Sequence, residues 1–250
     1  MRVLVITEDD PLYVIHFFDV FMAEYPTEEI DIVGVTISRP FHESQIATAR
    51  RVLRFYGPID FARLAQRVVA AKLGRRSIER SVRAAGLPLV AADSVNAPAY
   101  VARVRSLQPD IIVSVAAPEI FRAELLGTAR LGCINLHSGR LPRYRGMMPT
   151  FWQMVNGEPS VTISVHEMAE ELDAGAVLGT RTAPIEPGTT LAEMMTSGKR
   201  EGATLMIQVL RELAAGTAER RPLDMQEASY FSFPKRGDAL ELRRRGHPLI

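Results

Sequence analysis

The stretch CINLHSGRLPRYRG, from Cys133 to Gly146, decides how the rest of this chain of 250 residues is interpreted. Its first part alternates apolar and polar side chains, which predicts a strand with Asn135 and His137 on one side. A loop rich in Gly and Pro follows, and α/β proteins often place functional groups on loops beside strand ends. An amide next to an imidazole can stabilise an oxyanion and move a proton. The alternative is structural: a turn-capping Asn and a hydrogen-bonded buried His.

The segments before this stretch alternate between strand patterns and helix patterns. Segments of strand length and mainly apolar character cover residues 2–7, 30–35, 88–90, 110–116 and 132–136. Helical spacing is found around Phe17 and Phe21, over residues 44–84 and 97–107, and from Pro118 onward. This alternation predicts the fold class α/β, with a Rossmann-like, mostly parallel sheet flanked by helices. A functional site is then expected at the carboxyl ends of the strands.

The segments after the loop predict fewer but longer elements. We expect Thr150 to cap a helix, strands over 160–166 and 176–182, and a helix over 189–215 that is softly broken near Gly198. No internal repeat or low-complexity linker interrupts the chain. We therefore expect one main domain over residues 1–216 and a short C-terminal extension over residues 217–250.

The composition disfavours several classes of protein. Hydrophobic residues make up 47% and charged residues 24%, and the net charge of +1 gives no bulk attraction to nucleic acid or to a membrane surface. No apolar run reaches the ~18 residues of a membrane span. The acidic residues soon after Met1 are unlike a secretory signal, and a single cysteine, Cys133, fits a reducing compartment. We expect a cytoplasmic protein without a membrane partner and with nucleic acid disfavoured.

Several segments resemble the start of known binding motifs but lack residues that those motifs require. The turn Thr7-Glu8-Asp9-Asp10-Pro11 lacks glycine, so it is no dinucleotide- or phosphate-binding loop. His166-Glu167 begins like a zinc protease helix but lacks the second histidine. Metal binding by His137, His166 and Asp173 stays an alternative to the expected absence of a metal. The arginines of residues 44–84 predict a solvated helix face, with a site for an acidic ligand or nucleic acid as the alternative.

Asn135-Leu136-His137 is the first of an ordered set of motifs. It is followed by Leu141-Pro142-x-Tyr144-Arg145-Gly146, Trp152, Asn156-Gly157-Glu158, His166-x-Met168 and Leu172-Asp173-x-Gly175. This set, within roughly residues 100–185, resembles the folate-dependent formyltransferase family. The signature of that family is Asn-x-His, a Leu-Pro-x-Tyr-Arg-Gly loop and a downstream Asp-x-Gly. The family loop usually reads Ser-Leu-Leu-Pro, whereas this chain has Gly139-Arg140-Leu141-Pro142.

The resemblance implies a transferase of one-carbon metabolism with three catalytic residues, Asn135, His137 and Asp173. Formyl transfer to an amine passes through a tetrahedral intermediate that carries an oxyanion, and protons must leave one nitrogen and reach another. Asn135 offers amide donors that do not titrate. An unperturbed imidazole, as in His137, has a pKa of about 6.5 and exchanges protons near neutrality. Asp173 is expected to orient or charge-balance His137 and to relay a proton through water.

The resemblance also implies supporting positions. His166 matches a family position, with a purely structural role as the alternative. The loop residues that shape the site or contact substrate are expected to be Ser138, Tyr144, Arg145 and Gly146. An ion pair inside the fold is the alternative role for Arg145, and Trp152 is expected in the core.

The formyl donor implied by the family is 10-formyltetrahydrofolate, and the chemistry needs no metal. The donor is expected against the backbone of two segments, with Ile120 and Phe121 flanking the flat pterin. The alternative places both segments in helix core. The predicted donor-binding residues are Glu119, Ile120, Phe121, Glu167, Met168 and Leu172.

The range of possible acceptors is narrowed by domains and turns that other family members have. Family members that act on initiator tRNA have a further C-terminal barrel, purine-pathway members have a Gly-rich first turn, and members that hydrolyse the donor have an N-terminal regulatory domain. We therefore expect a small-molecule primary amine, such as an amino sugar nucleotide or an amino-acid-derived metabolite. The alternatives are a methionyl-tRNA formyltransferase-like enzyme, a formyl-folate hydrolase and an inactive folate-binding protein. A homodimer is left open.

Overall fold

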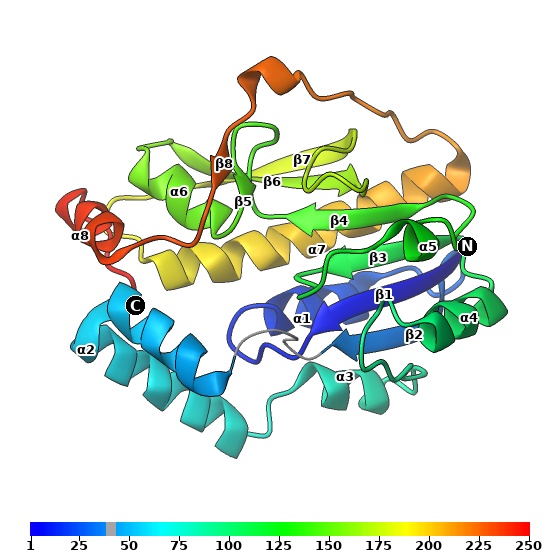
Figure 1. Ribbon diagram of the computed structural model, residues 1–250, viewed down its shortest axis with the longest axis horizontal. Helices are drawn as coiled ribbons and strands as arrows, with labels where there is room; N and C mark the ends of the chain where they lie inside the picture. Colours follow the sequence, from blue (N-terminus) through cyan, green and yellow to red (C-terminus); the bar gives the residue numbers. More distant parts are fainter. Residues whose placement is uncertain (39–43) are drawn as a thin grey trace.

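The computed structural model describes residues 1–38 and 44–250 and contains a six-stranded mixed sheet in the order β2-β1-β3-β4-β6-β7. Four neighbouring strands are parallel: β2 (Asp31–Ser38), β1 (Arg2–Glu8), β3 (Ile111–Val115) and β4 (Cys133–His137). The other two, β6 (Ser160–Glu167) and β7 (Val177–Pro184), are antiparallel to their neighbours. The arrows of the four parallel strands all point to the left in Figure 1. The predicted α/β fold is confirmed, and the antiparallel pair extends the sheet beyond β4.

Helices cover both faces of this sheet, which is why the parallel strands are continuous apolar runs. One face packs on α1 (Ile15–Glu24) and α7 (Leu191–Ala215), with Phe17, Phe21 and Val209 in its core. The other face packs on α4 (Pro98–Leu107) and the short α5 (Ala123–Leu126). Every side chain of β3 is buried as a result. None of the helices within the described residues combines the length and apolar character of a membrane span.

Helix α7 is continuous, so the predicted break near Gly198 is wrong. Thr190 and Glu193 form a capping box at its start, and Gly216 ends it in the left-handed conformation. A Cβ atom on Gly202 would lie 2.6 Å from a methyl of Leu136. The small residues of this helix therefore permit its close packing under β4.

The arginine-rich segment forms α2 (Gln45–Leu73) and α3 (Ile78–Ala84). Helix α2 is kinked where Gly57 has a φ of 76°, immediately before Pro58. The C-terminal helix α8 (Arg236–Arg244) lies beside α2, and Figure 1 shows both at the end of the molecule to which the parallel strands point. Arg243 Nη2 is 2.6 Å from the buried Asp60 carboxylate, which joins the two helices.

The C-terminal segment returns across the molecule after α7. It passes through a 3₁₀ turn, η1 (Met225–Glu227), and forms β8 (Tyr230–Phe231). β8 pairs in parallel with β5 (Arg145–Gly146), the end of the Cys133–Gly146 stretch. In Figure 1 this segment runs from the right over the top and down beside β5. The last residues of the chain include Leu242 and Leu249, both fully buried.

Three local predictions are wrong for reasons of tertiary structure. Residues 118–122 are not helical, because Asn96 binds the Ile120 carbonyl and the Arg122 N–H through its side chain. Thr150 does not cap α6 (Pro149–Val155), whose N-cap is Met148. Residues 88–90 contribute only an isolated bridge between Leu89 and Val35.

Candidate active site

Asn135 and His166 face each other across the antiparallel pair β4–β6. Register places Asn135 opposite His166 and His137 opposite Ser164. Directly opposed side chains on one face of such a pair lie close together, and Asn135 Nδ2 is 3.2 Å from His166 Nε2. The alternation along each strand therefore brings together residues that are 31 positions apart in the chain.

His166 is arranged to accept a hydrogen bond from Asn135. Its Nδ1 lies 2.8 Å from the Glu167 carbonyl oxygen, so the ring N–H is assigned to Nδ1 and the lone pair to Nε2. Burial lowers the pKa of His166 well below its usual range, with the charge of His137 acting in the same direction and Asp173 opposing. A neutral ring of this tautomer fixes the Asn135 amide and leaves its second N–H free for a ligand.

His137 is enclosed by two acceptors. Its Nε2 lies 2.6 Å from the Tyr144 carbonyl oxygen, to which it donates, and its Nδ1 lies 3.7 Å from Asp173 Oδ1. This bond assigns the ring N–H to Nε2, so Nδ1 is the nitrogen that faces Asp173. Nδ1 is therefore the atom at which His137 can take up or release a proton beside the Asp173 carboxylate.

Asp173 is buried between the two histidines. Its Oδ2 accepts a hydrogen bond of 2.9 Å from the Gly146 N–H, and its Oδ1 lies 3.6 Å from His166 Nε2. The separations from both rings exceed hydrogen-bond range, so Asp173 acts on them here through its charge. Its φ of 52° is a left-handed conformation that Asp tolerates better than most residues.

Steric crowding explains why the third position of the Asp-x-Gly motif is glycine. A Cβ atom on Gly175 would lie 1.9 Å from the backbone oxygen of Glu167, so only glycine lets this loop approach the end of β6. Asp173 is carried on the same loop. The motif therefore encodes both the carboxylate and the close approach that places it.

Arg145 and Gly146 position Asp173 from the other side. The Arg145 guanidinium lies 3.0 Å from the Leu172 carbonyl oxygen and 2.7 Å from the Glu171 carboxylate. Its side chain is only 11% exposed. Arg145 thus forms an ion pair, but its partner Glu171 is 66% exposed, so the pair lies at the surface rather than inside the fold. A substrate contact of Arg145 stays a prediction.

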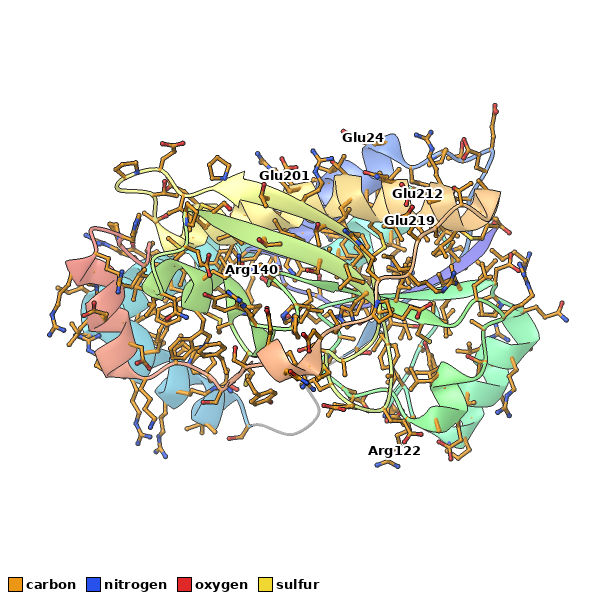
Figure 2. The ribbon with its side chains drawn as sticks, turned by 90° about the horizontal axis from the view of Figure 1, so that it is seen from above. Glu24, Arg122, Arg140, Glu201, Glu212 and Glu219 are labelled. Atoms are coloured by element: carbon orange, nitrogen blue, oxygen red, sulfur yellow. The ribbon has the colours of Figure 1, made fainter. Side chains whose placement is uncertain are left out.

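Gly139 and Arg140, where this chain differs from the usual family loop, pack together with Tyr144. Tyr144 is buried and donates its hydroxyl to Glu158 at 2.8 Å, and Arg140 binds the same carboxylate oxygen at 2.5 Å. Arg140 is labelled in Figure 2. A Cβ atom on Gly139 would lie 2.7 Å from His137 Nε2 and 2.8 Å from the Tyr144 oxygen. Glycine here therefore permits the close contact between His137 and the loop.

A cavity of about 490 Å³ opens at the carboxyl ends of the parallel strands. Asn135, His137, Ser138 and Asp173 line it, together with Gly146 and Leu172. His166 does not line it and acts through Asn135 and Asp173. The cavity also receives three charged residues that the sequence analysis left out of the site: Glu8, Asp10 and Lys199. The acidic turn after the first strand was the available signal for two of them, whereas Lys199 had none.

The predicted donor-binding residues are divided between two places. Leu172 is in the cavity just described, whereas Glu119 and Ile120 line a second cavity of about 630 Å³ that shares Pro118 with it. The Glu119 carboxylate is engaged by Ser94 Oγ at 2.6 Å. Ile120 is 61% exposed, but Phe121 is only 1% exposed. The expectation that the Phe121 side chain flanks a pterin is therefore wrong, because that ring is in the core.

Glu167 and Met168 take part in local structure at the end of β6. The Glu167 carboxylate binds Arg220 at 2.6 Å, and the Met168 N–H donates to the Cys133 carbonyl at 2.8 Å. Trp152 is partly buried against the core, and its indole stacks on Phe231. Within residues 1–38 and 44–250, no group of three or more His, Cys, Asp or Glu side chains could hold a metal ion.

Comparison with known proteins agrees with this geometry. The family described as "Formyl transferase" matches residues 43–210. A methionyl-tRNA formyltransferase of Geobacter metallireducens is 36% identical over 155 residues, which are 62% of this chain and 50% of that protein. The chain thus spans about half the length of that relative.

Solved structures of low identity share the fold. A sugar N-formyltransferase from Shewanella sp. has a TM-score of 0.62 at 20% identity, with 98% of this chain and 87% of that chain covered. An N-formyltransferase from Helicobacter canadensis, solved with folinic acid and dTDP-3-aminofucose, has a TM-score of 0.60 at 13% identity, with 93% and 71% covered. Because the family match covers more than half of its residues, the chain belongs to the formyl transferase family, and the resemblance found in its sequence is confirmed.

Proposed function

We propose that this protein transfers the formyl group of 10-formyltetrahydrofolate to the primary amine of a small molecule. The observation that carries the proposal is the convergence of Asn135, His137 and Asp173 on one cavity at the strand ends. Family membership supports formyl transfer as the reaction class. The Helicobacter relative solved with folinic acid supports a folate donor. In this proposal residues 1–216 are the catalytic domain, and a cytoplasmic location and a homodimer stay predictions.

Each of the three side chains has a defined part in the proposed reaction. The free N–H of Asn135 stabilises the oxyanion that forms when the amine attacks the formyl carbon. His137 supplies the proton that the departing folate nitrogen needs, from Nδ1, the ring nitrogen that faces Asp173. Asp173 stabilises the charged ring that takes part in this exchange and relays to it, through water, the proton that the attacking nitrogen loses. His166 acts as a positioning residue, because it orients the amide of Asn135.

Thermal unfolding with a stable analogue of the donor tests this proposal. A ligand of the native state at about 100 times its dissociation constant adds about 2.7 kcal/mol to the free energy of unfolding. For a chain of this size the expected rise in Tm is about 5–10 °C. The control is p-aminobenzoylglutamate, the part of the folate that remains when the pterin is removed. An unchanged Tm at saturating analogue would contradict a folate donor.

A second candidate is supported by one observation, the 36% identity to a methionyl-tRNA formyltransferase. On this alternative the acceptor amine is that of a methionyl-tRNA. Formylation assays with methionyl-tRNA and with small amines in parallel separate the two. Transfer to methionyl-tRNA alone would replace the small-molecule acceptor in the proposal. Formate release that needs no amine would instead favour the hydrolase, and folate binding without turnover the inactive binding protein.

A further inference from the structure

The end of the cavity away from Asn135 carries an unusual pair of charges, Glu8 and Lys199. Glu8 ends β1, and Lys199 projects from α7 into the same cavity. Thr7 pairs with Val115 on β3, and Val115 pairs with Leu136 on β4. Glu8 is the residue after Thr7, and His137 is the residue after Leu136. The two therefore lie at the same height along the sheet, two strands apart. With neighbouring strands ~4.8 Å apart, their backbones are roughly 10 Å from each other.

Neither charged group of this pair has a direct polar partner among the described residues. Within residues 1–38 and 44–250, the Glu8 carboxylate and the Lys199 ammonium form no hydrogen bond or ion pair. Asp10, the third charged residue here, is different, because its carboxylate accepts from the N–H groups of Leu12 and Tyr13 at 2.8 and 3.2 Å. Asp10 is therefore engaged by the turn that precedes α1, whereas Glu8 and Lys199 remain available to a ligand.

Partial burial of two opposite charges without contact opposes folding, and such groups are typical of binding sites. Burial, reinforced by Asp10 and opposed by Lys199, raises the pKa of Glu8 to about 7. Burial also lowers the pKa of Lys199, against the attraction of Glu8 and Asp10. The other ionisable groups that line this cavity are Tyr13, His137 and Asp173.

We propose that Glu8 and Lys199 form the acceptor-binding end of the cavity and select a small amine that also carries an anionic group. This inference rests on the proposed formyl transfer and names the chemical class of its acceptor. The Glu8 carboxylate binds the acceptor's ammonium group, and Lys199 binds the carboxylate or phosphate of the same molecule. Glu8 then takes one proton from the ammonium, which leaves a neutral amine for attack and a neutral carboxylic acid on Glu8. The roughly 10 Å between Glu8 and His137 leaves room for the amine between the two side chains.

Binding of three simple probes to the full chain tests the inference without any turnover. The probes are β-alanine, 2-aminoethyl phosphate and ethanolamine, titrated by ligand-observed NMR. We expect at least one of the two probes with an anionic group to bind about tenfold more tightly than ethanolamine. The preferred anion, carboxylate or phosphate, identifies the source of the negative charge. Equal affinity for all three probes would overturn the inference on the wild-type protein alone.

Variants then assign the effect to the two side chains. Lys199→Met should abolish the advantage of the anionic probes, and Lys199→Arg should retain it. Glu8→Gln should weaken binding of all three amines and remove a transition near pH 7 from the pH dependence of binding. Unchanged discrimination in Lys199→Met would contradict the inference.

The same experiments distinguish failure of this inference from failure of the proposed function. If the probes discriminate as expected but the folate analogue gives no rise in Tm, the acceptor class stands and the donor is wrong. If the analogue binds but the probes do not discriminate, the donor stands and the acceptor class is wrong.

Discussion

The two ends of the cavity are built in opposite ways. At the catalytic end, which we define as Asn135, His137, His166 and Asp173, each side chain has a polar partner within the protein. At the acceptor end, defined as Glu8 and Lys199, neither does so within the described residues. The catalytic end is therefore organised before any ligand binds, which is what stabilisation of a developing charge requires. The acceptor end obtains its partners from the ligand, so its charges determine which ligand binds.

The largest effect is expected from truncation at the catalytic end. Asn135→Ala and His137→Ala should each lower kcat for formyl transfer by about a hundredfold or more, because loss of a single oxyanion donor costs about 3–4 kcal/mol. His247→Ala is a matched control, since that ring faces the Thr189 carbonyl and does not line the cavity. Steady-state rates of tetrahydrofolate release measure the effect. Near-normal rates in both variants would remove the catalytic assignment.

A smaller loss is expected when the support of Asp173 is disturbed. Gly175→Ala places a Cβ atom against the Glu167 backbone, which must move the loop that carries Asp173. We expect kcat to fall by about 10- to 100-fold, since displacement of a catalytic group by about 1 Å can cost that much. Gly237→Ala is the control, because nothing lies within 4 Å of a Cβ there. Equal rates in the two variants would show that the position of Asp173 is not critical.

Glu8, at the acceptor end, should make the free energy of unfolding depend on pH. The pKa of Glu8 is about 7 in the folded protein and near 4.5 in the unfolded chain, so the unfolded chain loses this proton first as the pH rises. The free energy of unfolding should therefore decrease between pH 5 and pH 7, an effect absent in Glu8→Gln. We expect the two proteins to diverge by about 2 kcal/mol over this range. Urea unfolding of both proteins at each pH measures this difference. The same pH dependence of the free energy of unfolding in both proteins would contradict the burial of Glu8.

His166 should act in the opposite direction at lower pH. The pKa of His166 is lower in the folded protein than in the unfolded chain. Its contribution to the free energy of unfolding is therefore complete above about pH 6.5 and is lost as the pH falls toward the folded-state pKa. His166→Gln should reduce this loss between pH 6.5 and pH 5. The measurement is Tm over that range, with His247→Gln as control. An unchanged slope would indicate that His166 is already protonated in the folded protein.

The smallest effect is expected from restoring the family residue at Arg140. Arg140→Leu removes an ion pair with Glu158 whose arginine side chain is 40% exposed. Partly exposed pairs contribute about 0–1 kcal/mol, so the free energy of unfolding should change by less than about 1 kcal/mol. A much larger loss would show that Arg140 is needed to hold Tyr144 and, through its carbonyl, His137.

Sequence reasoning reached the catalytic end because local pattern determines it. Alternation along one strand places Asn135 and His137 on one side, and Gly175 marks the close approach that places Asp173. It did not reach Lys199, because that residue enters the cavity only through the packing of α7 under β4, where Gly202 meets Leu136. Likewise, the Asn96 side chain, which prevents a helix at residues 118–122, comes from a segment more than twenty residues earlier. Contacts of this kind leave no periodic signal in the chain.

The most direct test of the account is the release of tetrahydrofolate from 10-formyltetrahydrofolate, measured with and without an added amine. The wild-type protein should release it only when a suitable amine is present, with β-alanine or 2-aminoethyl phosphate more effective than ethanolamine. His137→Ala should lower that rate by about a hundredfold while still binding the amines. Release at the same rate without any amine, or an unchanged rate in His137→Ala, would contradict amine formylation by this cavity.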